Sequence, residues 1–221
     1  MVKILGHRKN VFWEAFLLTA TIFILGLLLG VAFEKSQTNK LNEYYLNAEI
    51  SLVDIMALNN FVDLEDMTCS QLISSNMLFA DRIYEEALIF ENFEDSWKIT
   101  GNVVLLHERY DILRTLLWIN VMKTREKCSE DFSSVIYLYE DSTDNLNKKA
   151  VQKVWSKILF DLKKEKGEKV ILIPIGVNND LTSLDLILSD FGVSEFPVVI
   201  INDEHVIQEL NSVSELEKYL D

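Results

Sequence analysis

The sequence predicts an α+α/β protein with one apolar N-terminal helix, a segment of three helices, and a C-terminal α/β domain. Three observations indicate this class. Residues 15–33 form a run of 19 residues without a charged side chain. From Val31 to Thr100 there is neither Gly nor Pro, which favours long helices because these residues are the usual breakers. After residue 130, β-prone and helix-prone segments alternate, which is typical of a sheet covered by helices.

The apolar run predicts a single transmembrane helix from about Trp13 to Phe33. At about 1.5 Å rise per residue, the uncharged run Ala15–Phe33 spans roughly 28 Å, close to the thickness of the hydrocarbon core of a bilayer. We therefore expect residues 1–35 to form a short tail and an anchor in the lipid bilayer. A cleaved signal peptide is the alternative, because Gly30–Ala32 could serve as a cleavage site, although the run exceeds the usual h-region.

Charges beside the apolar run predict its direction in the cell membrane. Lys3, Arg8 and Lys9 precede it, whereas the far side begins with Glu34-Lys35. The positive-inside rule then places the N-terminus in the cytoplasm and the domains that follow outside it. The chain carries a formal net charge of −14, so we do not expect it to bind nucleic acid.

A helical domain is predicted for residues 36–130. Apolar residues three and four positions apart place its helices at about 38–60, from Asp66 or Thr68 to just before a turn at 97–101, and at about 102–127. The first of these could continue directly from the membrane helix, since no breaker separates the two. The apolar stripes are most simply contacts within one core. An oligomerising or partner-binding coiled coil is the alternative, so a homo-oligomer stays open.

The α/β domain is predicted for residues 131–221, with the element order β-α-β-α-β-β-α and the first two strands parallel. We expect strands at 135–139, 169–177, 196–201 and 205–207, helices at 146–166, 184–191 and from about 212 to 220, and a hairpin turn at 202–204. The apolar side of the helix at 146–166 is expected to comprise Val151, Val154, Trp155, Ile158, Leu159 and Leu162.

One short motif in this domain resembles a known fold family. Phe196-Pro197-Val198 opens the third predicted strand, after a helix and a Gly192-Val193 step. With this order of elements, the C-terminal region is similar to thioredoxin-like domains, in which a cis-proline at this place borders the substrate groove. The resemblance implies a thioredoxin-like domain for residues 131–221, a cis bond before Pro197, and a groove beside Phe196, Pro197 and Val198.

The chain as a whole resembles archaeal membrane-anchored proteins with one transmembrane helix, a helical segment bearing two separated cysteines, and a C-terminal thioredoxin-like domain. The features that match are the anchor, Thr68-Cys69-Ser70, Glu126-Lys127-Cys128 and the C-terminal domain.

The chain departs from redox-active thioredoxin-like proteins at the position of their C-x-x-C motif. In that family the motif follows the first strand, where a helix N-terminus lowers the pKa of the attacking thiol. Here the degenerate position holds Ser142, Thr143, Asp144 and Asn145, without a sulfur atom. We therefore expect no dithiol exchange in this domain, no catalytic residue and no cofactor.

Cys69 and Cys128 are the two cysteines, near the start of the second predicted helix and the end of the third. In an antiparallel helical hairpin these ends lie together, so a structural disulfide is expected, worth about 4 kcal/mol in the chain-entropy model. Two buried thiols, or a redox-labile or metal-binding pair, are the alternatives. The histidines His7, His107 and His205 are scattered, which predicts no metal site. Carboxylate pairs such as Asp203-Glu204 are expected to be solvated.

These observations favour a non-catalytic protein-binding or scaffold function at the outer face of the membrane. Its partner would be an unidentified membrane or extracytoplasmic protein, held beside Pro197 or at a sheet edge. An accessory thiol-disulfide oxidoreductase that uses Cys69 and Cys128, and a helical oligomerisation module, are the alternatives.

Overall fold

The computed structural model describes residues 5–62, 67–97, 102–128, 132–141, 143–178 and 180–220. The chain divides into two compact units, Met1–Asn47 and Ala48–Asp221. The second unit includes most of the segment predicted as a helical domain, residues 36–130, together with all of residues 131–221.

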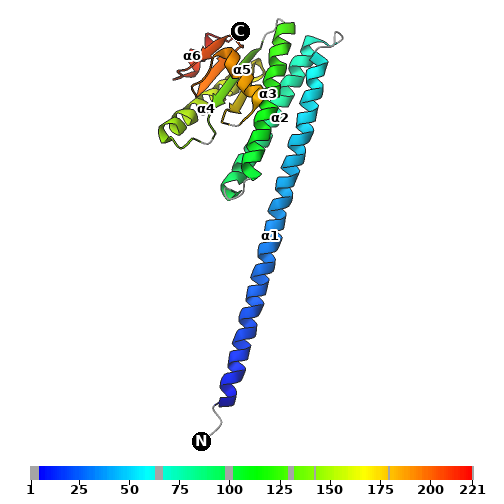
Figure 1. Ribbon diagram of the computed structural model, residues 1–221, viewed down its shortest axis with the longest axis vertical. Coiled ribbons are helices and arrows are strands. Elements are labelled where there is room, and N and C mark those ends of the chain that lie inside the picture. Colours follow the sequence, from blue (N-terminus) through cyan, green and yellow to red (C-terminus); the bar gives the residue numbers. More distant parts are fainter. Residues whose placement is uncertain are drawn as a thin grey trace. The chain divides into compact units, whose positions relative to one another are not determined.

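Helix α1 runs without interruption over Leu5–Val62, so the predicted membrane helix does continue into the next predicted helix (Figure 1). Within it, Val11–Phe33 is long and apolar enough to cross a membrane, with a mean hydropathy of 2.5. It is the one helix of this kind in the described part of the chain. The hydroxyl groups of Thr19 and Thr21 donate to backbone carbonyls one turn earlier, so this apolar stretch satisfies its own polar groups.

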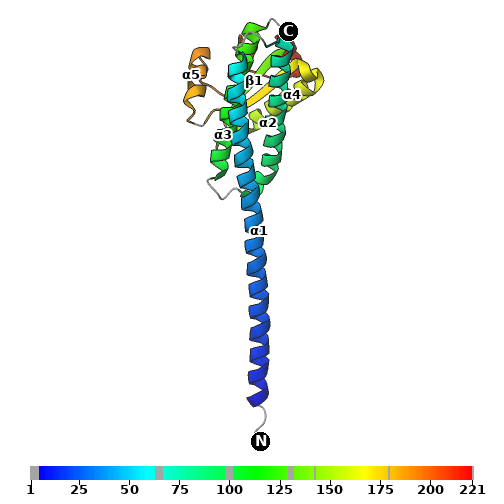
Figure 2. The same cartoon turned by 90° about the vertical axis from the view of Figure 1, so that its right-hand side faces the viewer.

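Helices α2 (Cys69–Trp97) and α3 (Asn102–Lys127) lie side by side in the second unit (Figures 1 and 2). Of the two predicted starts of this helix, Asp66 and Thr68, Thr68 is confirmed by a reciprocal pair of hydrogen bonds. The backbone N–H of Thr68 donates to Gln71 Oε1 at 3.1 Å, and the N–H of Gln71 donates to Thr68 Oγ1 at 3.4 Å. This capping box satisfies donors that the first turn of a helix leaves unpaired.

The sheet has four strands in the order β2-β1-β3-β4. They are β1 (Ser133–Tyr139), β2 (Val170–Gly176), β3 (Val198–Ile201) and β4 (His205–Ile207). Strands β1 and β2 are parallel, and β3 is antiparallel to both of its neighbours. The connections contain α4 (Leu146–Lys166), a short 3-10 turn at Gly167–Lys169, and α5 (Thr182–Phe191), and α6 (Val213–Glu217) follows β4. The predicted order of elements is therefore confirmed.

One face of the sheet packs against α4 and α6. This core contains Val135, Tyr137, Val170, Val199 and Ile201 from the strands and Trp155, Leu159, Leu162, Leu210 and Leu216 from the surrounding segments. The predicted apolar side of α4 is wrong at its N-terminal end, because Val151 and Val154 are 44% and 55% exposed. Gln152 is buried instead, since its side chain bonds to the backbone of Glu140 through both an N–H donor and an acceptor oxygen.

The opposite face is covered by α3 and α5, and Figure 2 shows α5 and α4 on different sides of the sheet. Its strand residues are almost completely buried: Ile136, Leu138, Ile171, Ile173, Ile175, Val198 and Ile200. Trp118 of α3 is fully buried and stacks on Phe191 of α5 with ring centroids 5.5 Å apart. Helix α3 is therefore a shared element, because it packs on α2 and on the sheet.

The predicted hairpin turn joins β3 to β4. Asn202 and Asp203 both have positive φ angles, 55° and 58°, and the backbone N–H of Glu204 donates to the carbonyl of Ile201 at 3.1 Å, which closes the turn between the paired residues Ile201 and His205. The prediction that Asp203 is solvated is wrong. Its carboxylate accepts a hydrogen bond from Trp118 Nε1 at 2.9 Å, and burial raises the pKa of this carboxyl group.

Candidate functional site

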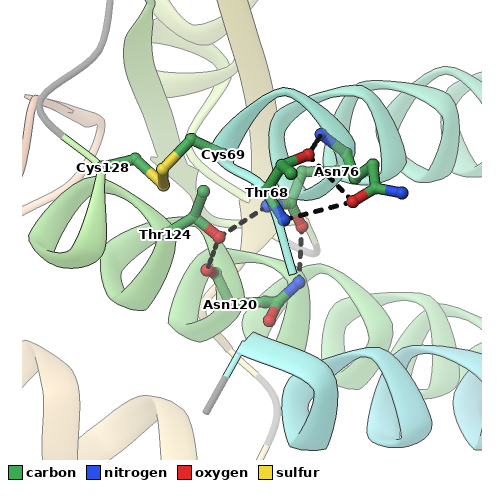
Figure 3. The surroundings of a disulfide bond; sticks show 7 residues. Thr68, Cys69, Asn76, Asn120, Thr124 and Cys128 are labelled. Atoms are coloured by element: carbon green, nitrogen blue, oxygen red, sulfur yellow. Dashed lines mark hydrogen bonds between the residues drawn. A yellow bond between two sulfur atoms is a disulfide. The ribbon is translucent and has the colours of Figure 1, made fainter. Parts of the chain in front are cut away.

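A disulfide between Cys69 and Cys128 joins the first residue of α2 to the residue that follows α3 (Figure 3). The two Cα atoms are 5.7 Å apart, and the bond closes a sequence separation of 59 residues. Cys128 is only 2% exposed and packs with the fully buried Leu72, against which Met67 and Cys69 also lie. The pair therefore sits at the helix ends that the sequence indicated.

A buried polar network lies beside the disulfide, between the same two helices (Figure 3). Asn76 Nδ2 donates to Thr124 Oγ1 at 2.9 Å, and Asn120 Nδ2 donates to Asn76 Oδ1 at 2.5 Å. All three residues are fully buried, so each hydrogen bond is made in a medium without competing water. The network and the disulfide join α2 to α3 independently of each other.

The residues that the sequence analysis assigned to a degenerate redox motif lie between the end of β1 and the start of α4. Ser142 falls outside the described residues, and Thr143 and Asp144 precede the helix. Asn145 is the N-cap of α4, since its side chain accepts hydrogen bonds from the backbone N–H groups of Asn147 and Lys148. The N-terminus of α4 is thus capped by an amide oxygen.

The start of β3 adjoins the same end of the sheet. The Phe196–Pro197 peptide bond is cis. Val198 pairs with Leu138 in antiparallel register, which places Pro197 opposite Tyr139 at the end of β1. Phe196 and Pro197 are half-buried, whereas Val198 is fully buried. Of the three predicted groove residues, Phe196 and Pro197 are thus partly accessible from outside, and Val198 belongs to the core.

An unexpected buried ion pair ties α3 to this end of the sheet. Asp111 is 2% exposed, and its Oδ1 accepts hydrogen bonds from the backbone N–H of Gly176 at 2.9 Å and from the Arg114 guanidinium at 3.2 Å. Burial raises the pKa of the Asp111 carboxyl, although Arg114 and the Gly176 N–H oppose this shift. The carboxylate therefore closes the end of β2, which is an edge strand among the described residues and has no strand on that side to supply an acceptor.

Arg114 links this ion pair to the end of β1. Burial alone would lower the pKa of Arg114, but the neighbouring Tyr139 and Asp111 outweigh burial and raise it. Burial also raises the pKa of Tyr139 to about 12, against the opposing effect of Arg114. The buried guanidinium of Arg114 therefore keeps its charge beside the Asp111 carboxyl group and the Tyr139 phenol.

A partly exposed histidine completes the cluster. His107 Nδ1 lies 3.6 Å from Asp141 Oδ2, and the two side chains are 21% and 26% exposed. Asp141 follows β1, and its backbone N–H donates to the side-chain oxygen of Asn178, which follows β2, at 2.8 Å. We call His107, Asp111, Arg114, Tyr139 and Asp141 the carboxyl-end cluster. In this cluster the His107 and Asp141 side chains are partly exposed, whereas Asp111 and Arg114 are buried, and none of the five residues carries a thiol.

The carboxyl-end cluster was missed because its members are far apart in sequence. One signal was present: Asp111 and Arg114, spaced i,i+3, interrupt the buried face of α3 that carries Tyr110, Leu113 and Leu117. Charges on such a face indicate a buried pair, often near a functional site. Among the described residues, no three His, Cys, Asp or Glu side chains are grouped as metal ligands would be. No family model, curated protein or solved structure matches the chain.

Proposed function

We propose that this chain is a single-pass membrane protein whose second unit lies outside the cytoplasm and binds a protein partner without thiol-disulfide exchange. The observation that carries the proposal is the junction of β1 and α4, where Asn145 caps the helix at the place of a redox cysteine. The strand order β2-β1-β3-β4 and the cis Phe196–Pro197 bond support a thioredoxin-like fold for this unit.

The anchor is supported by the length and composition of α1. At about 1.5 Å per residue, Val11–Phe33 is long enough to cross the hydrocarbon core of a bilayer, and its apolar stretch is not buried inside the protein. The basic residues Lys3, Arg8 and Lys9 favour a cytoplasmic N-terminus. An extracytoplasmic location in turn suits the Cys69–Cys128 disulfide, because disulfides persist in oxidising compartments.

The partner surface that we infer is the end of the sheet where Phe196 and Pro197 adjoin the carboxyl-end cluster. Half-buried Phe196 supplies an apolar contact, and His107 with Asp141 supplies polar contacts beside it. Rigid aromatic anchors next to hydrogen-bonding groups are common at protein interfaces.

A redox assay separates this function from the accessory oxidoreductase. The full chain in detergent should neither reduce nor isomerise a disulfide substrate, because Cys128 is buried and α4 begins without a thiol. Turnover that is lost in Cys69→Ser would overturn the proposal and favour the oxidoreductase.

Crosslinking in native membranes tests the partner surface. A photoreactive phenylalanine analogue at position 196 should form a discrete adduct with another protein. The matched control is the same analogue at Phe160 of α4, which is 47% exposed. Adducts at 160 but not at 196 would contradict the assigned surface.

Protease treatment of sealed cells tests the orientation. An epitope tag after Asp221 should be removed from intact cells, whereas a tag before Met1 should be protected until the membrane is opened. The reverse pattern would place the second unit in the cytoplasm and refute this part of the proposal.

A further inference from the structure

One face of α1 in the second unit exposes a strip of mainly apolar side chains. Ile50, Val53, Met56 and Phe61 are 65%, 64%, 53% and 45% exposed, and Ala57 between them is exposed as well. Isolated apolar residues on a surface are ordinary, but a strip along one helix face marks an interaction site.

The strip is separate from the face of α1 that packs inside the unit. Ile55 is fully buried and Ser51 is 3% exposed, so these residues serve the internal core. Beside the strip, Asp54 is bound to Arg82 of α2 with an O–N distance of 3.3 Å. The exposed strip is therefore left over after the unit has formed its own core.

We propose that this strip of α1 pairs with the same strip of a second copy of the chain, as a parallel two-helix contact. The inference rests on the proposed membrane anchor. Two anchored copies necessarily run in the same direction, and the same number of residues separates Phe33 from Ile50 in both. Identical strips therefore meet in register, and confinement to the membrane raises their effective concentration.

The spacing of the strip fits a parallel helix pair. Ile50 and Ala57 fall at the first core position of a heptad, and Val53 and Asn60 fall at the second. Apolar residues thus occupy three of these four core positions, and Asn60 of one copy would lie level with Asn60 of the other. The Asn60 amide already donates to the carbonyl of Met56 at 3.0 Å, so its side chain stays close to the helix.

The residues that flank the strip agree with this pairing. Met56 and Phe61 occupy the two flanking positions that face each other across a parallel pair, which adds an apolar contact on each side. Glu49 would face Asp54 of the second copy. The guanidinium of Arg82, already bound to Asp54 in each copy, offsets that repulsion. The strip is short, so the pair needs the anchor to form.

Cysteine crosslinking of the full chain in membranes tests the pairing. Val53→Cys should give a dimer with a short bismaleimide, which reacts with free thiols and leaves the native disulfide intact. The control Lys153→Cys lies on the exposed side of α4 and should stay monomeric. Equal dimer yields for the two variants, or a Val53→Cys adduct with a different protein instead of a dimer, would overturn the proposal.

Co-isolation of two differently tagged copies gives a second measurement. Val53→Glu should lower co-isolation about tenfold or more, because it places like charges opposite each other. Val154→Glu changes a valine of α4 that is 55% exposed, against 64% for Val53, and should leave co-isolation unchanged. Equal loss of co-isolation in both variants, or no loss in Val53→Glu, would refute pairing through this strip.

Alkaline extraction of the same membranes tests the anchor separately. Release of the chain into the soluble fraction would refute the anchor, whatever the crosslinking shows.

Discussion

The carboxylate of Asp111 on α3 accepts a hydrogen bond from the backbone N–H of Gly176 at the end of β2, at an O–N distance of 2.9 Å. The same carboxylate also leaves no room for a side chain at position 176. A Cβ atom at position 176 would lie 2.8 Å from Asp111 Oδ2, inside the contact distance of the two atoms. Glycine at 176 and aspartate at 111 are therefore matched to each other across two elements.

Gly176→Ala should lower the free energy of unfolding by about 2 kcal/mol, because the added methyl group overpacks the Asp111 carboxylate. Denaturant titration followed by tryptophan fluorescence measures this value. In an Asp111→Ala background the same substitution should cost clearly less, since the opposing oxygen is gone. An equal cost in both backgrounds would show that the clash is not with Asp111.

The stability that Asp111 contributes should depend on pH. Burial raises the pKa of this carboxyl above its value of 3.8 in an unfolded chain, so the folded state binds this proton more tightly than the unfolded chain does. The associated stability is present below about pH 3.8 and is lost as the pH rises through the folded-state pKa. The free energy of unfolding of the wild type relative to Asp111→Asn should therefore fall with rising pH across this window. Denaturant titrations of both proteins at several pH values measure this difference. A difference that rises with pH would contradict the prediction.

Removal of the disulfide by Cys69→Ala with Cys128→Ala should lower the free energy of unfolding by up to about 4 kcal/mol, mainly because the unfolded chain regains freedom. A reductant should destabilise the wild type in the same direction and leave the double variant unchanged. If the double variant were as stable as the oxidised wild type, the bond would have no structural role.

Asn120→Ala should cost about 1–3 kcal/mol of stability, because it leaves the buried Asn76 Oδ1 without its 2.5 Å donor. Replacing both residues with leucine should cost less than the sum of the two single leucine substitutions, since no half-satisfied amide remains. Asn147→Ala, at an exposed position of α4, is the control for loss of an asparagine side chain. Additive effects at Asn76 and Asn120 would show that the two amides act separately.

Local signals account for the parts of the fold that the sequence predicted well. Helix α4 begins and ends where Asn145 and Gly167 indicate, since a cap and a positive-φ glycine act within one turn. The hairpin at Asn202 likewise depends on the conformational preferences of two residues. The candidate site was predicted only in part, because Phe196 and Pro197 form a short motif whereas the carboxyl-end cluster has no local pattern.

The sequence by itself determined the long apolar helix, the element order and the helix ends that bring the two cysteines together, because periodicity, caps and breakers act over short distances. Only the tertiary structure decided that α3 covers the sheet and that Asp111 binds Gly176, 65 positions away. It also decided that Trp118 binds Asp203, 85 positions away. Such pairs depend on which faces meet after the chain has folded, and that information is spread over the whole core rather than held in one segment.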